Sequence, residues 1–572
     1  MIDSIKTPEF ADQVKTDGVK SSFREGVIYR YPAMVPLLEV SGDHYEMGLQ
    51  YGVLLRPEIL RALESIQSIF KWKAEEPAMP VADFSSMFTA NAEQIAERLP
   101  ERFQQELQGM ADGSGVPFAT VITASLMYDS SEAAACSGVL MKGKDGRIIH
   151  GRNNDTSSYG GEETGKMIVI VRHRAKGYNV VTHMDYPLWG GVETGYNNQG
   201  LTFSEETLSV RNPNPDGFSL IYLIRMALEE CTTFEDLYTL FDRYPVIGAY
   251  GCVWGQRKQG RGMVAELTPT AWKATEMASS LKWNFNHLYD AELRKQQSPL
   301  PNIAGNNWDR EAIAETFPQK TEYKVEDAIE FLRLQKGPDN IDYSCHGLRH
   351  PICNLGTQEM VVFDPEEDGL YLAWGTCYAS RNDVYRIHED FSHPPERFLA
   401  ADPVDPLVEQ IALILNRLVT SKLKLDALVA LSKEHNQAAY IHFLAAFFAF
   451  QQSRFDLLIH HANKAFSLEP EIAEHQLYAG MAASLEKNFD AVISLLEAID
   501  SKQLYPNHEL YRLSILESVW VKTDPGVSSK YADAKASILK EHDAKQHFKT
   551  AMLQLLAAMD NDKNDNDTAG RK

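Results

Sequence analysis

The chain has no CxxC pair, no long apolar run and no excess of basic residues. Its six cysteines stand far apart in the sequence, which excludes a zinc ribbon and a thioredoxin-type redox motif. No run of about 18 uninterrupted apolar residues occurs, so we expect no transmembrane helix. The N-terminal residues 1–18 lack an apolar stretch, so we predict no signal peptide and a cytoplasmic protein with free thiols.

The charge and the length exclude further classes. Asp and Glu number 79 against 56 Lys and Arg, a formal net charge of −23. This balance argues against a nucleic-acid partner, because polyanions need a basic face. The chain is 572 residues long, which exceeds a single core of about 250–300 residues, so we expect at least two domains. We expect neither a metal ion nor a cofactor.

Residues 1–135 carry mostly helical patterns. A short strand-like piece, VPLLEV (35–40), precedes a glycine-containing stretch, SGDHYEMGLQYG (41–52). Amphipathic patterns then cover residues 54–72 and 88–115, and the second ends in the glycine-rich stop 113–115. We therefore predict a helical segment before residue 136.

Residues 136–400 alternate short β-type runs with helices. ACSGVLMK and RIIHGRNND flank the turn KGKDG, and EMVVFDPEEDGLYLAWG (359–375) is typical of a hairpin. One long helical pattern covers residues 217–244. Many strands with helices between them predict a layered α+β catalytic domain that ends near residue 400.

From residue 405 to 560 the pattern is helical throughout. The pairs Phe455-Asp456 and Phe489-Asp490 are separated by 34 residues, and Ala446 and Gly480 share that offset. This is the period of a tetratricopeptide-type (TPR) helix pair. We predict a TPR-like domain, with a plain helical bundle as the alternative, and a disordered polar tail at 561–572.

One cysteine lies close to charged residues in the predicted sheet. Cys136 stands in AAACSG, and Arg152 and Asp155 follow in GRNND (151–155). A hairpin of these two runs brings the start of one strand beside the end of the next. A nearby cation can lower the pKa of a thiol. On these facts two interpretations remain open, a reactive thiol or a buried strand cysteine beside a structural ion pair.

Four stretches resemble the N-terminal-nucleophile (Ntn) cysteine hydrolases, specifically the self-cleaving isopenicillin N acyltransferase branch. SGDHYEMGLQYG is similar to the prosegment motif G-x-x-x-E-x-G-x-x-x-G, and ELQGMADGSGV (106–116) to the segment before the cleavage site. ACSG with GRNND resembles the nucleophile strand shared with bile salt hydrolases and lipid amidases. WNFNHLYDAEL (283–293) resembles the Asn-His segment. The resemblance spans residues 28 to about 380.

The resemblance implies a four-layer αββα sandwich and self-cleavage between Ala135 and Cys136. It implies that Cys136 is the nucleophile, that its freed α-amino group is the base, and that Asp155 orients that amine. Arg152 is expected to support the thiolate and the substrate carbonyl, and Asn286 to stabilise the oxyanion. The sequence departs from the family at Ala135, where glycine is frequent.

Two further positions have weaker expected roles. Thr207 stands near a position where bile salt hydrolases have asparagine, so we expect only its backbone N–H to serve the oxyanion. Trp189 lies between predicted strands beside two glycines. It lines a substrate pocket or packs in the core, and both interpretations stay open.

These features together predict an autoproteolytically activated amide hydrolase or acyltransferase that acts on a linear N-acyl amide. The cleaved fragments, residues 1–135 and 136–572, are expected to stay associated. The TPR-like domain is expected to bind a protein partner or a second copy of the chain. Two alternatives remain: a TPR scaffold protein with a degenerate enzyme domain, and a phospholipase-B-like hydrolase of lipid esters.

Overall fold

The computed structural model divides the chain into two compact units. It describes residues 5–6, 10–75, 81–127, 129, 135–155, 167–297, 307–338, 340–345, 349–363, 369–417, 419–521, 524–541 and 550–560. Unit 1 comprises Met1–Ser298, Asn302–Asn340 and His350–Leu418, and unit 2 comprises Pro299–Pro301, Ile341–Arg349 and Val419–Lys572. Helix α11, Pro406–Asn416, thus belongs to unit 1, so the division falls after the boundary that we placed near residue 400.

The described residues of unit 1 form two β-sheets. Sheet A has the order β1-β2-β3-β4-β7-β8-β9-β10-β11-β12-β13. Its strands are Lys15–Asp17, Lys20–Phe23, Gly26–Tyr29, Leu37–Gly42, Val169–Ala175, Val181–Asp185, Thr194–Asn197, Leu201–Leu208, Ala249–Gln256, Arg261–Leu267 and Trp272–Glu276. Sheet B has the order β14-β5-β6-β15-β16-β17-β18. Its strands are Leu281–Asn284, Ala135–Lys142, Ile148–Asp155, Thr357–Phe363, Leu370–Trp374, Val384–Ile387 and Glu396–Leu399.

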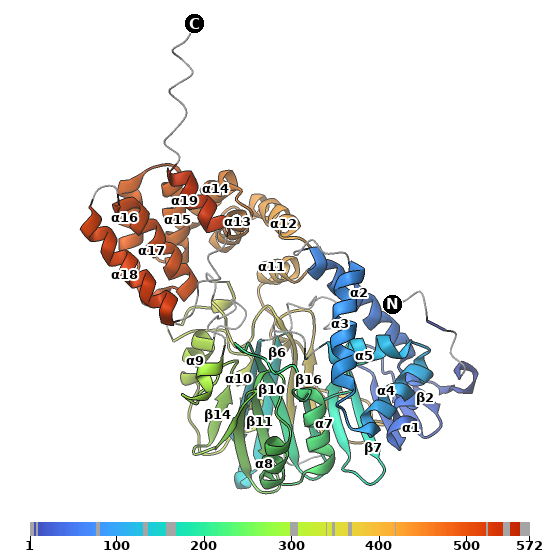
Figure 1. The fold of residues 1–572 in the computed structure, drawn as a ribbon. Helices are drawn as coiled ribbons and strands as arrows, with labels where there is room; N and C mark the ends of the chain where they lie inside the picture. The colour runs from blue at the N-terminus through green and yellow to red at the C-terminus, as the bar shows by residue number, and fades with distance from the viewer. Residues whose placement is uncertain are drawn as a thin grey trace. The chain divides into compact units, whose positions relative to one another are not determined.

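The two sheets face each other and carry helices on their outer sides. Strands β10 and β11 of sheet A pack on β5 and β6 of sheet B. Helices α7 (Leu220–Glu230) and α8 (Phe234–Arg243) lie over sheet A, and α10 (Val325–Leu332) packs on β6 and β15 of sheet B (Figure 1). Helix α9 is Asn307–Glu315. The α+β class is confirmed, and the layers follow the order α, β, β, α.

The long helix that we predicted over residues 217–244 is two helices. Helix α7 ends at Glu230, and α8 starts after Thr233 with a capping box. The Thr233 side chain accepts a hydrogen bond from the Asp236 backbone N–H, and the Asp236 carboxylate accepts one from the Thr233 backbone N–H. These reciprocal bonds satisfy backbone donors at the new helix start, which is why the chain breaks there.

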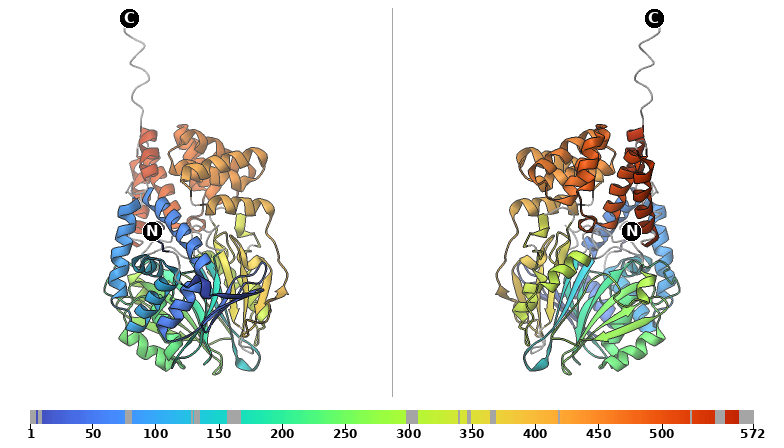
Figure 2. Two further views of the ribbon diagram at one scale, coloured as in Figure 1. Left: turned by 90° about the vertical axis from the view of Figure 1, so that its right-hand side faces the viewer. Right: turned by 90° about the vertical axis from the view of Figure 1, so that its left-hand side faces the viewer.

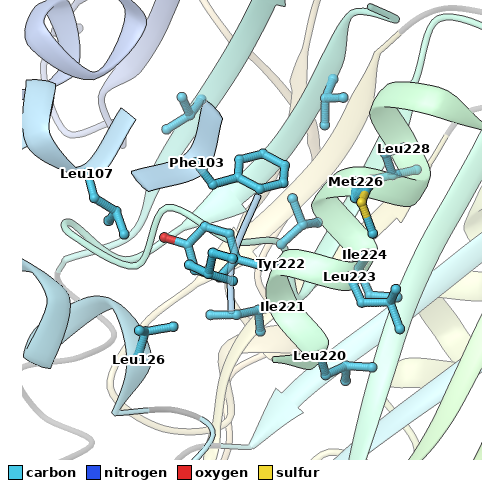
Figure 3. Close-up of a cluster of buried hydrophobic side chains, with 14 of the residues drawn as sticks. Phe103, Leu107, Leu126, Leu220, Ile221, Tyr222, Leu223, Ile224, Met226 and Leu228 are labelled. Atoms are coloured by element: carbon cyan, nitrogen blue, oxygen red, sulfur yellow. The ribbon is translucent and has the colours of Figure 1, made fainter. Parts of the chain in front are cut away.

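Among its described residues, the segment before residue 136 contains five α-helices, and its strands β1–β4 belong to sheet A. The helices are α1 His44–Leu54, α2 Arg56–Glu75, α3 Val81–Ala96, α4 Glu101–Ser114 and α5 Phe118–Leu126. Strand β4 pairs in parallel with β7. Figure 3 shows Phe103 and Leu107 of α4 and Leu126 of α5 gathered around Tyr222 and Ile221 of α7. The segment is thus part of the hydrophobic core of unit 1.

Unit 2 is a series of helices, most of which pack on their neighbours in sequence. They are α12 Ser421–Glu434, α13 Ala439–Gln451, α14 Phe455–Leu468, α15 Ala473–Leu485, α16 Phe489–Glu497, α17 Pro506–Trp520, α18 Pro525–Glu541 and α19 Thr550–Asp560, drawn in orange and red in Figure 2. Helices α13 and α15 begin 34 residues apart, and so do α14 and α16. The 34-residue repeat is present as helix pairs. That these pairs are TPR-like stays a prediction. The predicted tail 561–572 lies outside the described residues.

The structure also bears on the expected lack of a membrane span. The longest described helix, α2, has 20 residues and carries charged side chains along its length. Over the described ranges, no helix combines the length and the apolar character that crossing a bilayer requires.

Candidate active site

The predicted hairpin exists and brings the site residues together. Strands β5 and β6 pair antiparallel, so that Ala135 lies opposite Asp155, Cys136 opposite Asn154 and Gly138 opposite Arg152. The thiol and the two charged residues therefore share one end of the hairpin. Cys136 is fully buried, at 0% exposure.

Arg152 contacts the thiol directly. Its Nη2 lies 3.1 Å from Cys136 Sγ and 3.2 Å from Glu205 Oε1, and its Nη1 donates to the Thr194 hydroxyl. On the other side of the thiol, Asn154 Oδ1 is 3.8 Å from Sγ. A planar guanidinium can make several such contacts at once, so Arg152 fixes the thiol relative to a carboxylate.

The expected lowering of the thiol pKa does not occur in the intact chain. Burial raises the pKa of Cys136 well above its ordinary value, and the Arg152 charge opposes that rise without overcoming it. Nearby carboxylates, first among them Glu205, raise the pKa further. The cation is where we expected it, but desolvation of a fully buried thiolate outweighs it.

Asn286 binds the backbone of Cys136. Its Oδ1 accepts the Cys136 backbone N–H at 2.7 Å, and its Nδ2 donates to the Thr207 carbonyl at 2.9 Å. The amide oxygen must face Cys136 because the groups on that side, the N–H and the Arg310 guanidinium, are both donors. Thr207 meets Asn286 through its carbonyl oxygen, while its hydroxyl donates to Glu205 at 3.1 Å.

Asp155 is held by two neutral donors. Thr357 Oγ1 donates to Oδ1 at 2.6 Å, and Asn354 Nδ2 donates to Oδ2 at 2.7 Å. Burial raises the pKa of Asp155 to about 6, against the lowering effect of Arg310 and of these two hydrogen bonds. The carboxyl group therefore titrates at mildly acidic pH.

The sequence analysis missed Arg310 and Glu205. Arg310, on α9, is fully buried; its Nη1 donates to the Cys136 carbonyl, and its Nη2 donates to Asn286 Oδ1 at 2.9 Å. Glu205 lies on β10 and pairs with Arg152. Neither has a spacing to Cys136 that a single sequence reveals, although EE at 205–206 within an apolar strand is an unusual pattern.

A second group of carboxylates adjoins the thiol site. Glu193 and Glu359 lie 3.7 and 3.9 Å from Arg152 Nη1, and Glu359 faces Asn154 across the sheet. Tyr186 donates to Glu359 Oε2 at 3.3 Å. The Tyr186 ring lies 4.8 Å from that of Trp189, so Trp189 adjoins this group. The four residues named for catalysis, Cys136, Arg152, Asp155 and Asn286, are brought together; their roles stay predictions.

Comparison with known protein families agrees with this geometry. Residues 141–377 match the family model described as acyl-coenzyme A:6-aminopenicillanic acid acyl-transferase. The match covers less than half of the chain and makes this region similar to that family. The match begins within β5, just after Cys136, and runs through β6, strands β7–β13 of sheet A and α10 to the residues after β16. It thus contains Arg152, Asp155 and Asn286.

Curated Ntn relatives match only in part. The chain is 30% identical over 182 residues to an N-acylethanolamine-hydrolyzing acid amidase of Caenorhabditis elegans, covering 28% of this chain and 48% of the relative. It is 21% identical over 188 residues to acid ceramidase of Mus musculus, covering 29% and 47%. The chain thus spans about half the length of these curated relatives.

Solved Ntn structures show a weaker likeness. The Caenorhabditis elegans N-acylethanolamine-hydrolyzing acid amidase ortholog is 17% identical, with 40% of this chain and 93% of that chain covered and a TM-score of 0.29. A mutant of the conjugated bile acid hydrolase from Clostridium perfringens is 11% identical, with 47% and 98% covered and a TM-score of 0.29. Such TM-scores are too low to establish a common fold.

Proposed function

We propose that this chain is a self-cleaving cysteine amide hydrolase or acyltransferase that acts on a linear N-acyl amide. The observation that carries the proposal is the joint placement of Cys136: its thiol lies 3.1 Å from Arg152, and its backbone nitrogen lies 2.7 Å from Asn286. A buried strand cysteine with only a packing role does not need the contact with Arg152. The family match and the names of the amidase relatives support the same chemistry.

The first step is cleavage before Cys136. The thiol sulfur attacks the Ala135 carbonyl carbon, the peptide C–N bond breaks, and the thiol proton passes to the Cys136 nitrogen. Water then hydrolyses the thioester, which restores the thiol and releases the Ala135 carboxyl group. The Cys136 nitrogen becomes an α-amino group with an ordinary pKa near 8, and the buried thiol gains access to substrate.

In turnover the α-amine acts as the general base. It takes the thiol proton while sulfur attacks the substrate carbonyl, and it returns the proton to the leaving amine. Asn286 Oδ1 and Asp155 orient the amine, and Arg310 holds the Cys136 carbonyl. The acyl-thioester then passes to water or to another amine.

The oxyanion requires a hydrogen-bond donor. Asn286 can supply one only if its Nδ2 gives up its present hydrogen bond. In the intact chain its Nδ2 donates to the Thr207 carbonyl. Release of that bond after cleavage turns an N–H toward the substrate, and one such donor is typically worth about 3–4 kcal/mol. The Thr207 backbone N–H stays the second candidate.

A denaturing gel tests the proposal. The wild-type chain of 64.4 kDa should separate into 135- and 437-residue fragments, and Cys136→Ala should stay intact. Cys231→Ala, at a buried cysteine that follows the last residue of α7, is the matched control and should still split. Cleavage in Cys136→Ala, or an intact wild-type chain without amide turnover, would refute the proposal; the second outcome fits the scaffold alternative.

A further inference from the structure

The buried shell around the thiol contains more acid than base. Five carboxyl groups and two guanidinium groups lie within it, each no more than 6% exposed: Asp155, Glu193, Glu205, Glu206, Glu359, Arg152 and Arg310. Burying a charge is costly unless the charge is paired and hydrogen-bonded. Buried carboxyl groups in excess therefore need hydrogen-bond donors or cations as partners. The contacts show which of the five groups have such a partner.

Three of the five carboxyl groups have close partners. Asp155 accepts from Thr357 and Asn354 at 2.6 and 2.7 Å. Glu206 accepts from Asn284 Nδ2 at 2.8 Å. Glu205 pairs with Arg152 at 3.2 Å and accepts from the Thr207 hydroxyl at 3.1 Å. The protein itself thus supplies close partners for these three carboxyl groups.

Glu193 and Glu359 differ from the other three. Among the described residues, Glu193 has no partner closer than Asn154 Nδ2 at 3.4 Å, and Glu359 none closer than Tyr186 at 3.3 Å. Charge-assisted hydrogen bonds to carboxylates are ordinarily about 2.7–2.9 Å long. Burial raises the pKa of both groups, and Arg152 opposes the rise. Among the described residues, the one cation beside these two carboxyl groups is Arg152, whose Nη1 lies 3.7 Å from Glu193 and 3.9 Å from Glu359.

This pair adjoins the nucleophile. Arg152 contacts Cys136 Sγ through Nη2 and both carboxylates through Nη1. Because one guanidinium makes all of these contacts, Glu193 lies at most about 9 Å from Sγ. Asn154 bridges the same gap, with Oδ1 toward the thiol and Nδ2 toward the two carboxylates. The thiol marks where a substrate carbonyl must be placed, independently of the acidic residues.

We propose that the amide substrate carries an ammonium group a few bonds from its scissile carbonyl, and that Glu193 and Glu359 bind this group. The inference rests on the proposed function and names its substrate class. The Tyr186 and Trp189 rings lie beside the pair, and aromatic faces also attract organic cations. Glu193 and Glu359 are thereby specificity-determining residues.

An organic cation fits this surrounding better than a metal ion does. The groups between the two carboxylates are the Asn154 amide N–H and the Arg152 guanidinium, which are donors and cannot act as ligands. An ammonium group brings N–H donors of its own, and among the described contacts Glu193 accepts a hydrogen bond through Oε2 alone. It would also place a positive charge beside two carboxyl groups that share Arg152 as their described cation.

Matched substrate pairs test the proposal in the self-cleaved wild-type protein. Octanoyl-putrescine carries the ammonium on the amine side, and octanoyl-pentylamine replaces it by a methyl group. Aminohexanoyl-octylamide carries it on the acyl side, and heptanoyl-octylamide is its neutral counterpart. We expect kcat/KM to favour the ammonium member of one pair by at least about tenfold, since a buried charge pair is formed with it alone.

The double variant Glu193→Gln/Glu359→Gln keeps the shape of both side chains and removes their charge. We expect it to bring the ratio of kcat/KM within the favoured pair close to one. Glu235→Gln, at an exposed glutamate that pairs with Arg261, is the control and should keep the wild-type ratio. A gel and a thermal midpoint establish that the variant cleaves and folds.

Each result of these experiments supports or overturns the proposal. Equal or better turnover of both neutral amides by the wild type overturns the substrate class and leaves the proposed function standing. A ratio that persists in the folded double variant overturns the assignment to Glu193 and Glu359. Should the variant fail to fold, inhibition of the wild type by free octylammonium but not by octanol supports the proposal, and equal inhibition overturns it. Failure to hydrolyse any amide overturns the proposed function and this inference together.

Discussion

Arg152 Nη2 lies 3.1 Å from Cys136 Sγ, while both residues stand on adjacent strands of one hairpin. The contact follows from the register, since Gly138 lies opposite Arg152 and residues 136 and 138 point to the same face of the sheet. A side chain at position 138 would meet the Glu206 carboxylate and Val253 of sheet A. The hairpin thus restricts how the side chains of Cys136 and Arg152 can lie relative to each other.

Arg152→Lys is predicted to impair the thiol although it keeps the positive charge. A lysine ammonium is a point charge and cannot bridge Cys136 and Glu205 as the guanidinium fork does. We expect self-cleavage, and alkylation of the thiol by iodoacetamide after cleavage, to slow by at least about tenfold. Timed gels and mass spectrometry of the 437-residue fragment measure both. Arg174→Lys, at an exposed site, is the control; wild-type rates in Arg152→Lys would contradict the prediction.

Gly48→Ala and Gly109→Ala are predicted to destabilise unit 1. Helices α1 and α4 cross with their backbones in contact, so that a Cβ at Gly48 would meet the Glu106 carbonyl and one at Gly109 the Tyr45 carbonyl. Backbone atoms cannot yield as a flexible side chain can, so we expect a loss of at least about 1–3 kcal/mol.

The thermal midpoint measures this loss, and Gly526→Ala is a suitable control. Gly526 is also helical, but its added Cβ would meet only the Asp524 side chain, at 3.3 Å. Substitution there should leave the midpoint unchanged or raise it slightly, since alanine favours helices. An unchanged midpoint in both Gly48→Ala and Gly109→Ala would show that the helices can separate without cost.

These glycines show what a single sequence does and does not reveal. The motif stretches 41–52 and 106–116 were recognisable by resemblance, but their physical reason, a close crossing of α1 and α4, needs the fold. The β5–β6 hairpin could be predicted from alternating apolar runs around a turn, and with it the meeting of Cys136 and Arg152. Glu193 and Glu359 could not, because Glu359 reaches the site from β15, which pairs with β6 far away in the chain, and Glu193 reaches it from the residue before β9 in the other sheet.

Asp185→Asn is predicted to stabilise the protein increasingly as the pH rises. Burial raises the pKa of Asp185 to about 8, although the Tyr51 hydroxyl donates to it at 2.6 Å and lowers it. The folded state therefore binds a proton that the unfolded state, with a pKa near 3.9, has already released. Wild-type stability contributed by this group is present at low pH and is lost as the pH rises toward 8.

Urea unfolding at pH 5 and pH 8 measures the effect. The stability of Asp185→Asn relative to the wild type should increase by up to about 4 kcal/mol between these pH values. Asp242→Asn removes a carboxylate near the surface that accepts a bond from Trp272, and it is the control for a general change in charge. A difference that stays constant with pH would mean that Asp185 is ionised in the folded protein.

Thr357→Val is predicted to shift the acidic limb of the activity profile to higher pH. The cleaved enzyme needs an ionised Asp155 to orient its α-amino group, and the pKa of Asp155 in the intact chain is about 6, so protonation of Asp155 should lower kcat/KM on the acidic side. The Thr357 hydroxyl donates to Asp155 at 2.6 Å and lowers its pKa. Without this donor the pKa rises, and we expect the limb to move up by about half to one pH unit.

A pH profile of amide hydrolysis by the self-cleaved variant measures the shift. Thr268→Val, where the hydroxyl donates to the Ala271 carbonyl at 2.7 Å far from the thiol, is the control and should keep the wild-type limb. A lower plateau with an unmoved limb would reduce Thr357 to a packing role, because packing alone changes the rate without changing the protonation of Asp155. A limb that moves to lower pH would contradict the sign of the hydrogen bond and so the orientation of Asp155 in the site.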